Sequence, residues 1–248
     1  MLNATIFGSK AKAYKDARPG YPGALFDWVA EQAKTRDAVW DCATGSGQAA
    51  VALSERFDRV FATDISADQV SAAVARPNIQ YSVAPAEASG LADHSVDAIT
   101  VATALHWFDF GRYWDEVRRV LRPGGVFAAW SYDHFTFDDP IEEALMGTLR
   151  PMLAPFWSDG NRIATEGYKD ADVHCPLQRL SVPRFEINES WPLSRVLDFA
   201  ESWSATMLLR QDPVLSRRLD ALLSTVKAQL EPRTYRVRAP IHVLAGRD

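Results

Sequence analysis

The chain has 248 residues, 47% of them hydrophobic, and a formal net charge of −5. This length and composition can bury a full core and predict one α/β domain with elaborations. The mild negative charge disfavours nucleic acid or an anionic membrane as the main partner, and no apolar run approaches the roughly 20 residues that a membrane helix needs.

Helices and strands are predicted to alternate through the first half of the chain. Helical spacing of apolar residues predicts helices at 23–33, 47–57, 66–75 and 110–121. Short apolar runs predict strands at 37–43, 59–64, 78–84, 96–104 and 126–132, the last one after a turn at 122–125. This alternation is typical of a parallel sheet that helices cover on both faces. Right-handed crossovers would then bring the loops that follow the strands to one edge of the sheet.

The pattern loosens after residue 132. Residues 138–180 are rich in Pro, Trp and Asp and predict an irregular helical lid. Beyond it, alternation predicts strands at 184–191 and 235–246, and amphipathic spacing predicts helices at 194–210 and 213–230. We expect one domain over residues 1–248, with an N-terminal arm and helix (1–35), a ligand-binding core (36–132) and lid elements (133–182 and 192–232).

The cysteines and histidines do not indicate a metal site. Cys42 and Cys175 form no metal-type pair and are interpreted as free thiols of a reducing cytoplasm. The five histidines show no H-x-x-x-H or similar ligand spacing. The N-terminal stretch MLNATIFGSKAKAYK lacks the apolar core of a signal peptide. We therefore expect a cytoplasmic protein without a structural metal.

The segment VWDCATGSGQAA, residues 39–50, predicts a strand, a glycine loop and the start of a helix. Gly45, Gly47 and Ala50 satisfy the G-x-G-x-x-A form of the dinucleotide fingerprint. Glycines let the backbone approach a ligand closely, and the helix N-terminus behind them offers free N–H groups. The arrangement suits a pyrophosphate and also the carboxylate of an amino acid, and a tight turn without a ligand has the same signature.

Two acidic residues and one turn narrow the choice of ligand. Asp41 closes the strand before the loop and, because like charges repel, favours an ammonium over a pyrophosphate. Asp64 ends the second strand, where an acid can bind the ribose hydroxyls of more than one adenosine-bearing cofactor. The third feature is the segment LRPGG, residues 121–125, between the fourth helix and the fifth strand.

Together these motifs resemble those of class I S-adenosylmethionine-dependent methyltransferases. VWDCATGSGQ resembles the family's first motif, usually written D-x-G-x-G-x-G, and FATDIS resembles its acidic second-strand motif. APAEASGLADHSVDAI resembles the segment before strand four, and LRPGG the turn before strand five. YKDARPGYP and ALHWF are similar to a narrower group, the methyltransferase type 11 or trans-aconitate methyltransferase-like proteins.

The resemblance implies a Rossmann-like sheet that is mostly parallel and seven-stranded, with an antiparallel last strand and helical lid elaborations. It also implies S-adenosyl-L-methionine as the cofactor and O-methylation of a small molecule, with a carboxylate as one candidate acceptor. Related folds methylate carbon and nitrogen as well, because function depends on the site rather than on the fold. We expect no nucleic-acid or membrane partner, and the sequence indicates no oligomeric state.

The family motifs assign cofactor binding to residues spread along the first 102 positions. These residues are Tyr14, Arg18, Asp41, Ala43, Thr44, Gly45, Gly47, Asp64, Ile65, Ala86, Glu87 and Ala102. By this resemblance Asp41 and the 43–47 backbone hold the methionine part of the cofactor. Asp64 takes the ribose hydroxyls, and Ile65 packs on the adenine.

The chain departs from the family pattern at two places in this set. Pro85 stands where many members have an aspartate that binds the adenine amino group, so adenine recognition must rely on Ala86 and Glu87. Ala43 replaces the first loop glycine. Since alanine tolerates most backbone conformations with φ below zero, we expect Ala43 to weaken the match only slightly.

The segment ALHWF follows the fourth strand and is expected to face the methyl group. His106 could donate a hydrogen bond to an acidic substrate oxygen or act as a base for a protic substrate. Trp107 offers an N–H donor and an aromatic wall beside the sulfonium. Arg18 could grip a carboxylate of the cofactor or of the substrate. A helix-capping His106, a core Trp107 and a purely structural arm are the plainer interpretations.

Aromatic residues of the predicted lid are further candidates for contact with a substrate. They are Trp157, Tyr168 and Trp203, although shielding aromatics and core aromatics look identical in a sequence. Two other functions stay open. One is an NAD(P)-dependent oxidoreductase, which leaves Asp41 and LRPGG unexplained and lacks a Tyr-x-x-x-Lys pair. The other is a non-catalytic protein that retains the cofactor pocket.

Overall fold

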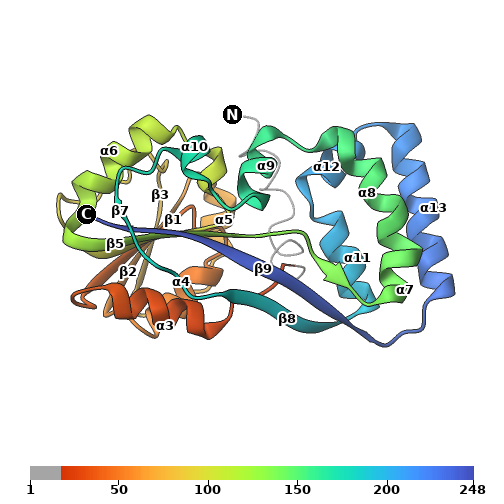
Figure 1. Cartoon of the computed structure of the whole chain (residues 1–248), viewed down its shortest axis with the longest axis horizontal. Helices are drawn as coiled ribbons and strands as arrows, with labels where there is room; N and C mark the ends of the chain where they lie inside the picture. Colours follow the sequence, from red (N-terminus) through yellow and green to blue (C-terminus); the bar gives the residue numbers. More distant parts are fainter. Residues whose placement is uncertain (1–17) are drawn as a thin grey trace.

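The computed structural model describes residues 18–248, whose strands form one nine-stranded sheet (Figure 1). The seven strands of five residues or more are β1 (Ala38–Cys42), β2 (Arg59–Asp64), β3 (Ile79–Val83), β4 (Val96–Ala102), β5 (Leu121–Tyr132), β8 (Phe185–Pro192) and β9 (Thr234–Arg247). The two-residue strands are β6 (Thr136–Phe137) and β7 (Gln178–Arg179). The five predicted strands β1–β5 are parallel and β9 is antiparallel to β5, so the predicted fold class is confirmed. The sheet has nine strands rather than the expected seven, because the short strands β6 and β7 also pair with β9.

The strand order β3-β2-β1-β4-β5-β9-β6 positions the candidate site. The chain moves outward from β1 through β2 to β3 and then returns to place β4 on the other side of β1. Crossovers that diverge from neighbouring strands leave a crevice outside their carboxyl ends, and ligands of open α/β sheets bind there. The loops after β1, β2 and β4 therefore meet at one edge of the sheet.

Helices cover both faces of the parallel part of the sheet. They are α3 (Gly23–Gln32), α4 (Gln48–Ser54), α5 (Ala67–Ser71) and α6 (Phe110–Val120). α3 and α4 bury apolar side chains in the cluster on one face, and α6 does so on the other. Because alternate residues of a strand point to opposite faces, Val39 belongs to the first cluster and Trp40 to the second.

The predicted turn at LRPGG is part of strand β5 in the structure, which begins at Leu121 rather than at residue 126. The segment bulges: Val96 pairs with Leu121, yet Ala98, two residues on, pairs with Val126. Gly124 supplies the positive φ of 75° that this bulge requires. The extra residues thus form a turn-like bulge within a continuous strand.

A group of helices lies at the other end of the molecule, beyond the carboxyl end of β5 (Figure 1). The segments of this group are α7 (Asp139–Ile141), the π-helix η2 (Glu142–Met146), α8 (Gly147–Leu153), η3 (Ala154–Phe156), α11 (Leu193–Glu201), α12 (Ser204–Leu209) and α13 (Pro213–Gln229). Two further helices return toward the sheet: α9 (Asp159–Thr165) contacts β5, and α10 (Asp170–Val173) lies beside α6 (Figure 1). The predicted irregular helical region is therefore present. The single helix expected at 194–210 is wrong, because the backbone is extended at Trp203 and the helix divides into α11 and α12.

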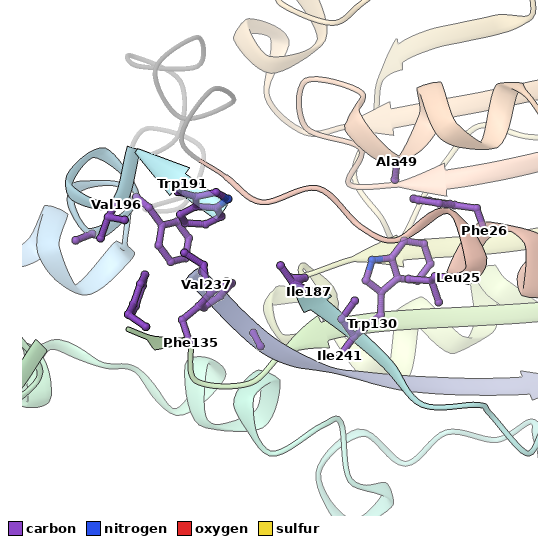
Figure 2. Packing of buried hydrophobic residues seen from close by; sticks show 14 of the residues in the cluster. Leu25, Phe26, Ala49, Trp130, Phe135, Ile187, Trp191, Val196, Val237 and Ile241 are labelled. Carbon is purple, nitrogen blue, oxygen red and sulfur yellow. The ribbon is translucent and has the colours of Figure 1, made fainter. Parts of the chain in front are cut away.

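One apolar cluster extends from the sheet into the helices (Figure 2). At one end Phe26 of α3 packs edge-on against Trp130 of β5, with ring centroids 5.7 Å apart. At the other end Phe135 packs against Phe199 of α11, with centroids 4.6 Å apart. Ile187 of β8 lies between these two ends (Figure 2). Buried residues of the long strands β8 and β9 thus connect the core beneath α3 with the core between the helices.

Candidate functional site

Two adjoining cavities lie at the carboxyl edge of the parallel strands. The first, here called the loop cavity, has a volume of about 220 Å³ and is lined by the loop after β1 together with Asp64 and Ile65. The second, the lid cavity, has a volume of about 340 Å³ and reaches from His106 to Trp157 and Trp203. The strand topology therefore brings the predicted loop residues and the predicted lid residues to neighbouring places.

The loop after β1 turns through three left-handed residues. Ala43, Gly45 and Gly47 have φ angles of 54°, 56° and 84°. Glycine adopts such angles without cost, whereas a residue with a Cβ is strained there. The expectation of a negative φ at Ala43 is wrong, because the path of the loop holds this residue in the left-handed region. Ala43, Thr44 and Gly45 line the loop cavity.

This strain makes Ala43→Gly a testable substitution. We expect the variant to keep the wild-type free energy of unfolding or to gain up to about 1 kcal/mol, because relief of left-handed strain offsets the added freedom of glycine in the unfolded chain. Ala50→Gly, inside α4, is the control and should lose about 1 kcal/mol or more. Urea denaturation measures both. Equal losses in the two variants would contradict the strained backbone at Ala43.

Asp64, at the end of β2, holds the loop in place and faces the loop cavity. Its Oδ2 accepts a hydrogen bond from the Gly45 backbone N–H at 2.8 Å, and its Oδ1 accepts one from the Ser66 N–H at 2.8 Å. Burial raises the pKa of this carboxyl above its ordinary value, although the two N–H donors oppose the shift. Ile65 beside it lines the same cavity with 62% of its surface exposed.

Asp41 lies behind the loop and outside the described lining of the loop cavity. It is fully buried, and its Oδ2 accepts a hydrogen bond from the Thr44 hydroxyl at 2.6 Å. Its Oδ1 accepts one from the Thr100 hydroxyl of β4 at 2.8 Å. Burial raises the pKa of Asp41 to about 6, against the effect of both hydroxyls. Asp41 therefore contacts a residue that lines the cavity, Thr44, without lining the described cavity itself.

Only one of the three predicted cofactor residues after β3 lies in the described lining of the loop cavity. Ala102, at the end of β4, belongs to the described lining of the loop cavity, whereas Ala86 and Glu87 do not. Ala86 is buried, and the Glu87 carboxylate accepts a hydrogen bond from the Asp109 N–H at 2.9 Å, at the start of α6. Tyr14 lies outside the described residues. Glu87 therefore holds the start of α6 and does not belong to the described lining of the loop cavity.

Residues of the arm before α3 close over both cavities. Arg18 lines both, and its guanidinium donates hydrogen bonds to the Tyr132 hydroxyl and, at 3.0 Å, to the Ser202 carbonyl. The Gln48 amide donates to the Pro19 carbonyl at 2.9 Å. These contacts place Arg18 at both cavities, and its grip on a carboxylate stays a prediction.

Thr103 is a lining residue that the motifs did not indicate. It follows β4 and has a φ of 55°, which is a strained conformation for a β-branched residue. Its hydroxyl is hydrogen-bonded to the Tyr21 hydroxyl at 2.8 Å, and it lines both cavities. Thr103 could have been found from the sequence, because it lies at the carboxyl end of a predicted strand, which is the end that faces the site.

The segment ALHWF forms a short 3-10 turn, η1 (Leu105–Trp107), between the cavities. His106 lines the lid cavity, and its Nδ1 lies 3.2 Å from the Tyr168 hydroxyl. Burial lowers the pKa of His106 to about 4, so the imidazole is neutral at neutral pH. Trp107 lines both cavities. Gly160 of α9 approaches so closely that a Cβ there would lie 3.4 Å from the His106 ring.

The aromatic candidates of the lid have two different places. Trp157 and Trp203 line the lid cavity with ring centroids 5.9 Å apart, as expected for substrate-shielding residues. Tyr168 is fully buried and contributes through His106 instead. Tyr132, Phe135 and Asn161 also line this cavity and were missed, since nothing in their sequence positions marks them.

Comparison with known proteins agrees with this geometry. A methyltransferase-domain family model matches residues 40–129. A Dictyostelium discoideum protein that bears the name of a methyltransferase is 39% identical over 202 residues, 80% of this chain and 76% of that protein. A solved structure from Anaeromyxobacter dehalogenans, described as a type II methyltransferase, has a TM-score of 0.81 and 38% identity and covers 93% of this chain and 97% of its own. The chain belongs to the class I S-adenosylmethionine-dependent methyltransferases.

A further relative supports the activity of this methyltransferase. A Saccharomyces cerevisiae protein named as an S-adenosylmethionine-dependent methyltransferase is 32% identical over 250 residues, 86% of this chain and 86% of that protein. Family membership decides against the NAD(P)-dependent oxidoreductase that the glycine fingerprint left open.

The loop cavity of this methyltransferase has the groups that the family's cofactor needs. Three groups line this one space. The Asp64 carboxylate suits ribose hydroxyls, and the exposed apolar side chain of Ile65 suits an aromatic ring. The backbone of the loop after β1 suits an amino-acid carboxylate. Within residues 18–248 no group of three or more His, Cys, Asp or Glu side chains is placed to hold a metal ion. None of the helices in the described part of the chain has the length and apolar character to span a membrane.

Proposed function

We propose that this methyltransferase transfers a methyl group from S-adenosylmethionine to a carboxylate oxygen of a small molecule. When bound, S-adenosylmethionine supplies an activated methyl group on a sulfonium. In the loop cavity Asp64 would hold the ribose hydroxyls, Ile65 would cover the adenine, and the backbone at Thr44 and Gly45 would hold the amino-acid part. Asp41 would orient Thr44 from behind.

The shared wall of the two cavities carries this proposal. Arg18, Thr103, Trp107 and Tyr132 each line both the loop cavity and the lid cavity. Methyl transfer from a sulfonium is an in-line displacement, in which the protein mainly holds nucleophile and methyl donor in contact and excludes water. A small molecule in the lid cavity would lie against the same side chains as a cofactor in the loop cavity.

The size of the lid cavity supports a small-molecule acceptor. Its volume of about 340 Å³ is in the range of pockets that enclose small ligands. Trp157, which follows η3, and Trp203, which precedes α12, line the cavity from the helical part of the chain. A nucleic-acid strand or a folded protein would need an open groove, and the chain's net charge of −5 adds no attraction for a polyanion.

The properties of His106 support a carboxylate as the nucleophile. Its pKa of about 4 makes it a weak base at neutral pH, so it is poorly suited to deprotonate a phenol or an amine. A carboxylate is already ionised at neutral pH and needs no base. A neutral imidazole can still donate one hydrogen bond to a substrate oxygen. The guanidinium of Arg18 adds a positive charge to the same wall.

The proposal predicts a base-labile product. Incubation with methyl-labelled S-adenosylmethionine and a panel of carboxylic acids, phenols and amines should label acids, and mild alkali should release the label as methanol. The rate should change little between about pH 7 and pH 8, because the acid, His106 and Asp41 largely keep their protonation states in that range. Label that survives alkali, or a rate that rises steeply with pH, would indicate a different acceptor.

A further inference from the structure

We propose that Tyr168 is a positioning residue, whose hydroxyl donates a hydrogen bond to Nδ1 of His106 and so fixes the imidazole with its Nε2–H toward the lid cavity. The inference rests on the proposed function, because it assigns how the same site would hold the acceptor. Tyr168 belongs to the described lining of neither cavity, so it would act only through His106.

The backbone of Tyr168 is held in place by the end of helix α9. The Tyr168 N–H donates to the Ile163 carbonyl at 3.0 Å, and the Gly167 N–H donates to the Ala164 carbonyl at 3.2 Å. With the left-handed φ of 82° at Gly167, these two bonds form a Schellman motif. Tyr168 itself has a φ of 53°, which a residue with a Cβ adopts only where its surroundings require it. The end of α9 therefore fixes the backbone from which this side chain projects.

The side chain of Tyr168 is fully buried beside the imidazole of His106. The two rings are stacked, with an interplanar angle of 25° and centroids 6.2 Å apart. The Tyr168 hydroxyl lies 3.2 Å from Nδ1, within hydrogen-bond distance. Burial raises the pKa of Tyr168 above its ordinary value, and His106 is neutral at neutral pH as well. The contact therefore joins a protonated phenol to a neutral imidazole.

The direction of this hydrogen bond follows from the chemistry of the two partners. A neutral imidazole has one N–H and one unprotonated nitrogen that accepts, and the bond made by one nitrogen decides where the proton lies. The unprotonated nitrogen is a stronger base than a phenol oxygen, and the phenol has a proton to donate. Tyr168 is therefore the donor and Nδ1 the acceptor, which leaves the imidazole proton on Nε2.

The Ser131 hydroxyl is a competing acceptor for the Tyr168 proton. It also hydrogen-bonds to Tyr168, and its own proton is donated to the Ala164 carbonyl at 2.5 Å. A serine oxygen is a much weaker base than an imidazole nitrogen, so the Tyr168 proton favours His106. If Ser131 took this proton, Nδ1 would carry the imidazole proton and Nε2 would present a lone pair.

An Nε2–H donor suits the acceptor class of the proposed function. His106 lines the lid cavity, and with Nδ1 turned to Tyr168 the nitrogen left for a ligand is Nε2. A carboxylate has two oxygens, so Nε2–H can hold one of them while the other forms the bond to the methyl carbon. No proton has to leave an acid that is already ionised, so a fixed donor serves this reaction better than a base.

The tautomer of His106 can be measured directly. In protein labelled with nitrogen-15 histidine and bound to S-adenosylhomocysteine, nuclear magnetic resonance at neutral pH distinguishes protonated from unprotonated ring nitrogens. His106→Gln identifies the His106 signals among the five histidines. We expect Nδ1 to be unprotonated and Nε2 to be protonated. Ser131→Ala should leave this pattern unchanged, because Ser131 is not the acceptor of the Tyr168 proton.

Tyr168→Phe tests the positioning role in turnover. It keeps the ring and removes the hydroxyl, so we expect protonation of Nδ1 to appear and kcat for the best acid of the panel to fall about 10-fold. The affinity for S-adenosylhomocysteine should stay within about twofold, because Tyr168 lies outside the described lining of the loop cavity. Tyr235→Phe is the matched control and should change neither quantity, since Tyr235 is also buried and its hydroxyl donates to the Glu231 carbonyl at 2.9 Å.

The outcomes separate the inference from the proposed function. A protonated Nδ1 in the wild type, or a change of tautomer in Ser131→Ala, would overturn the inference, and both spectra can be recorded even if Tyr168→Phe does not fold. A folded Tyr168→Phe that keeps the wild-type tautomer or the wild-type kcat would also overturn it. If no acid yields an ester while the His106 tautomer is as expected, the proposed function fails and the positioning of His106 by Tyr168 stands.

Discussion

Asp64→Ala is expected to weaken the binding of S-adenosylmethionine by about 100-fold, the equivalent of about 3 kcal/mol. The substitution removes the carboxylate proposed to hold the ribose hydroxyls. It also removes the acceptor for the N–H groups of Gly45 and Ser66, so the loop loses a contact that shapes the cavity. Titration calorimetry with S-adenosylhomocysteine gives the affinity directly.

Two further variants separate these contributions. Asp64→Asn keeps the shape and one acceptor oxygen, and we expect it to fall between wild type and Asp64→Ala. Asp68→Ala is the matched control, since Asp68 is exposed in the first turn of α5, four residues along the chain. If Asp64→Ala bound the cofactor within about twofold of wild type while remaining folded, the loop cavity could not be the cofactor site as described.

The meeting of the loops at one sheet edge could be predicted because it follows from topology. Parallel strands joined by right-handed crossovers all end on the same side, so Ala43, Asp64 and Ala102 were expected near one another. The structure places all three on the loop cavity. The alternation of short strands and helices contained this information without any knowledge of side-chain packing.

Backbone angles and side-chain directions could not be predicted in the same way. Alanine occurs at almost any φ below zero, and the left-handed angle at Ala43 is imposed by the path of the loop between β1 and α4. Asp41 was expected to act on an ammonium, but its carboxylate is turned to Thr44 and Thr100, a partner on another strand. A hydrogen bond across strands 59 residues apart leaves no local signal.

The lid cavity was the part least accessible to sequence reasoning. Arg18, Tyr132, Trp157 and Trp203 come from segments far apart in the chain. They meet because the helices that carry the lid dock on the sheet, α11 on β8 and α9 on β5. Helical periodicity tells which face of a helix is apolar, not which surface it will contact. The aromatic residues of the lid were recognised as candidates, while their division into cavity-lining Trp203 and fully buried Tyr168 depended on that docking.

Asp41→Asn is expected to change the pH dependence of stability. Burial raises the folded-state pKa of Asp41 from 3.8 to about 6. Between about pH 4 and pH 6 the folded protein therefore keeps a proton that the unfolded chain releases, and stability decreases as pH rises through this window. The shift corresponds to about 3 kcal/mol of cost at pH 7, as an order of magnitude. Asp41→Asn removes this cost.

The expected signature is a crossing of two stability curves. At about pH 8 Asp41→Asn should equal or exceed the wild type in free energy of unfolding, and near pH 4, where wild-type Asp41 is protonated, it should show no advantage. Near pH 4 Asp41→Ala should lose about 2–4 kcal/mol relative to the wild type, because it leaves the Thr44 and Thr100 hydroxyls without their acceptor and opens a cavity. The loss should be smaller at pH 8, because alanine also removes the cost of ionising the buried carboxyl. A wild type that gains stability from pH 4 to pH 6 more steeply than Asp41→Asn would contradict the raised pKa.

The same variants show how Asp41 influences the cofactor. If it acts by orienting Thr44, then Asp41→Ala and Thr44→Val should both weaken S-adenosylhomocysteine binding by about 10-fold, because each breaks the 2.6 Å hydrogen bond. If it acts through its charge on the cofactor's ammonium, Asp41→Asn should weaken binding while Thr44→Val should not. The geometry favours the first result, since both carboxylate oxygens are engaged by hydroxyls and the side chain lies outside the described lining of the loop cavity. Unchanged affinity in Asp41→Ala would remove Asp41 from the cofactor site altogether.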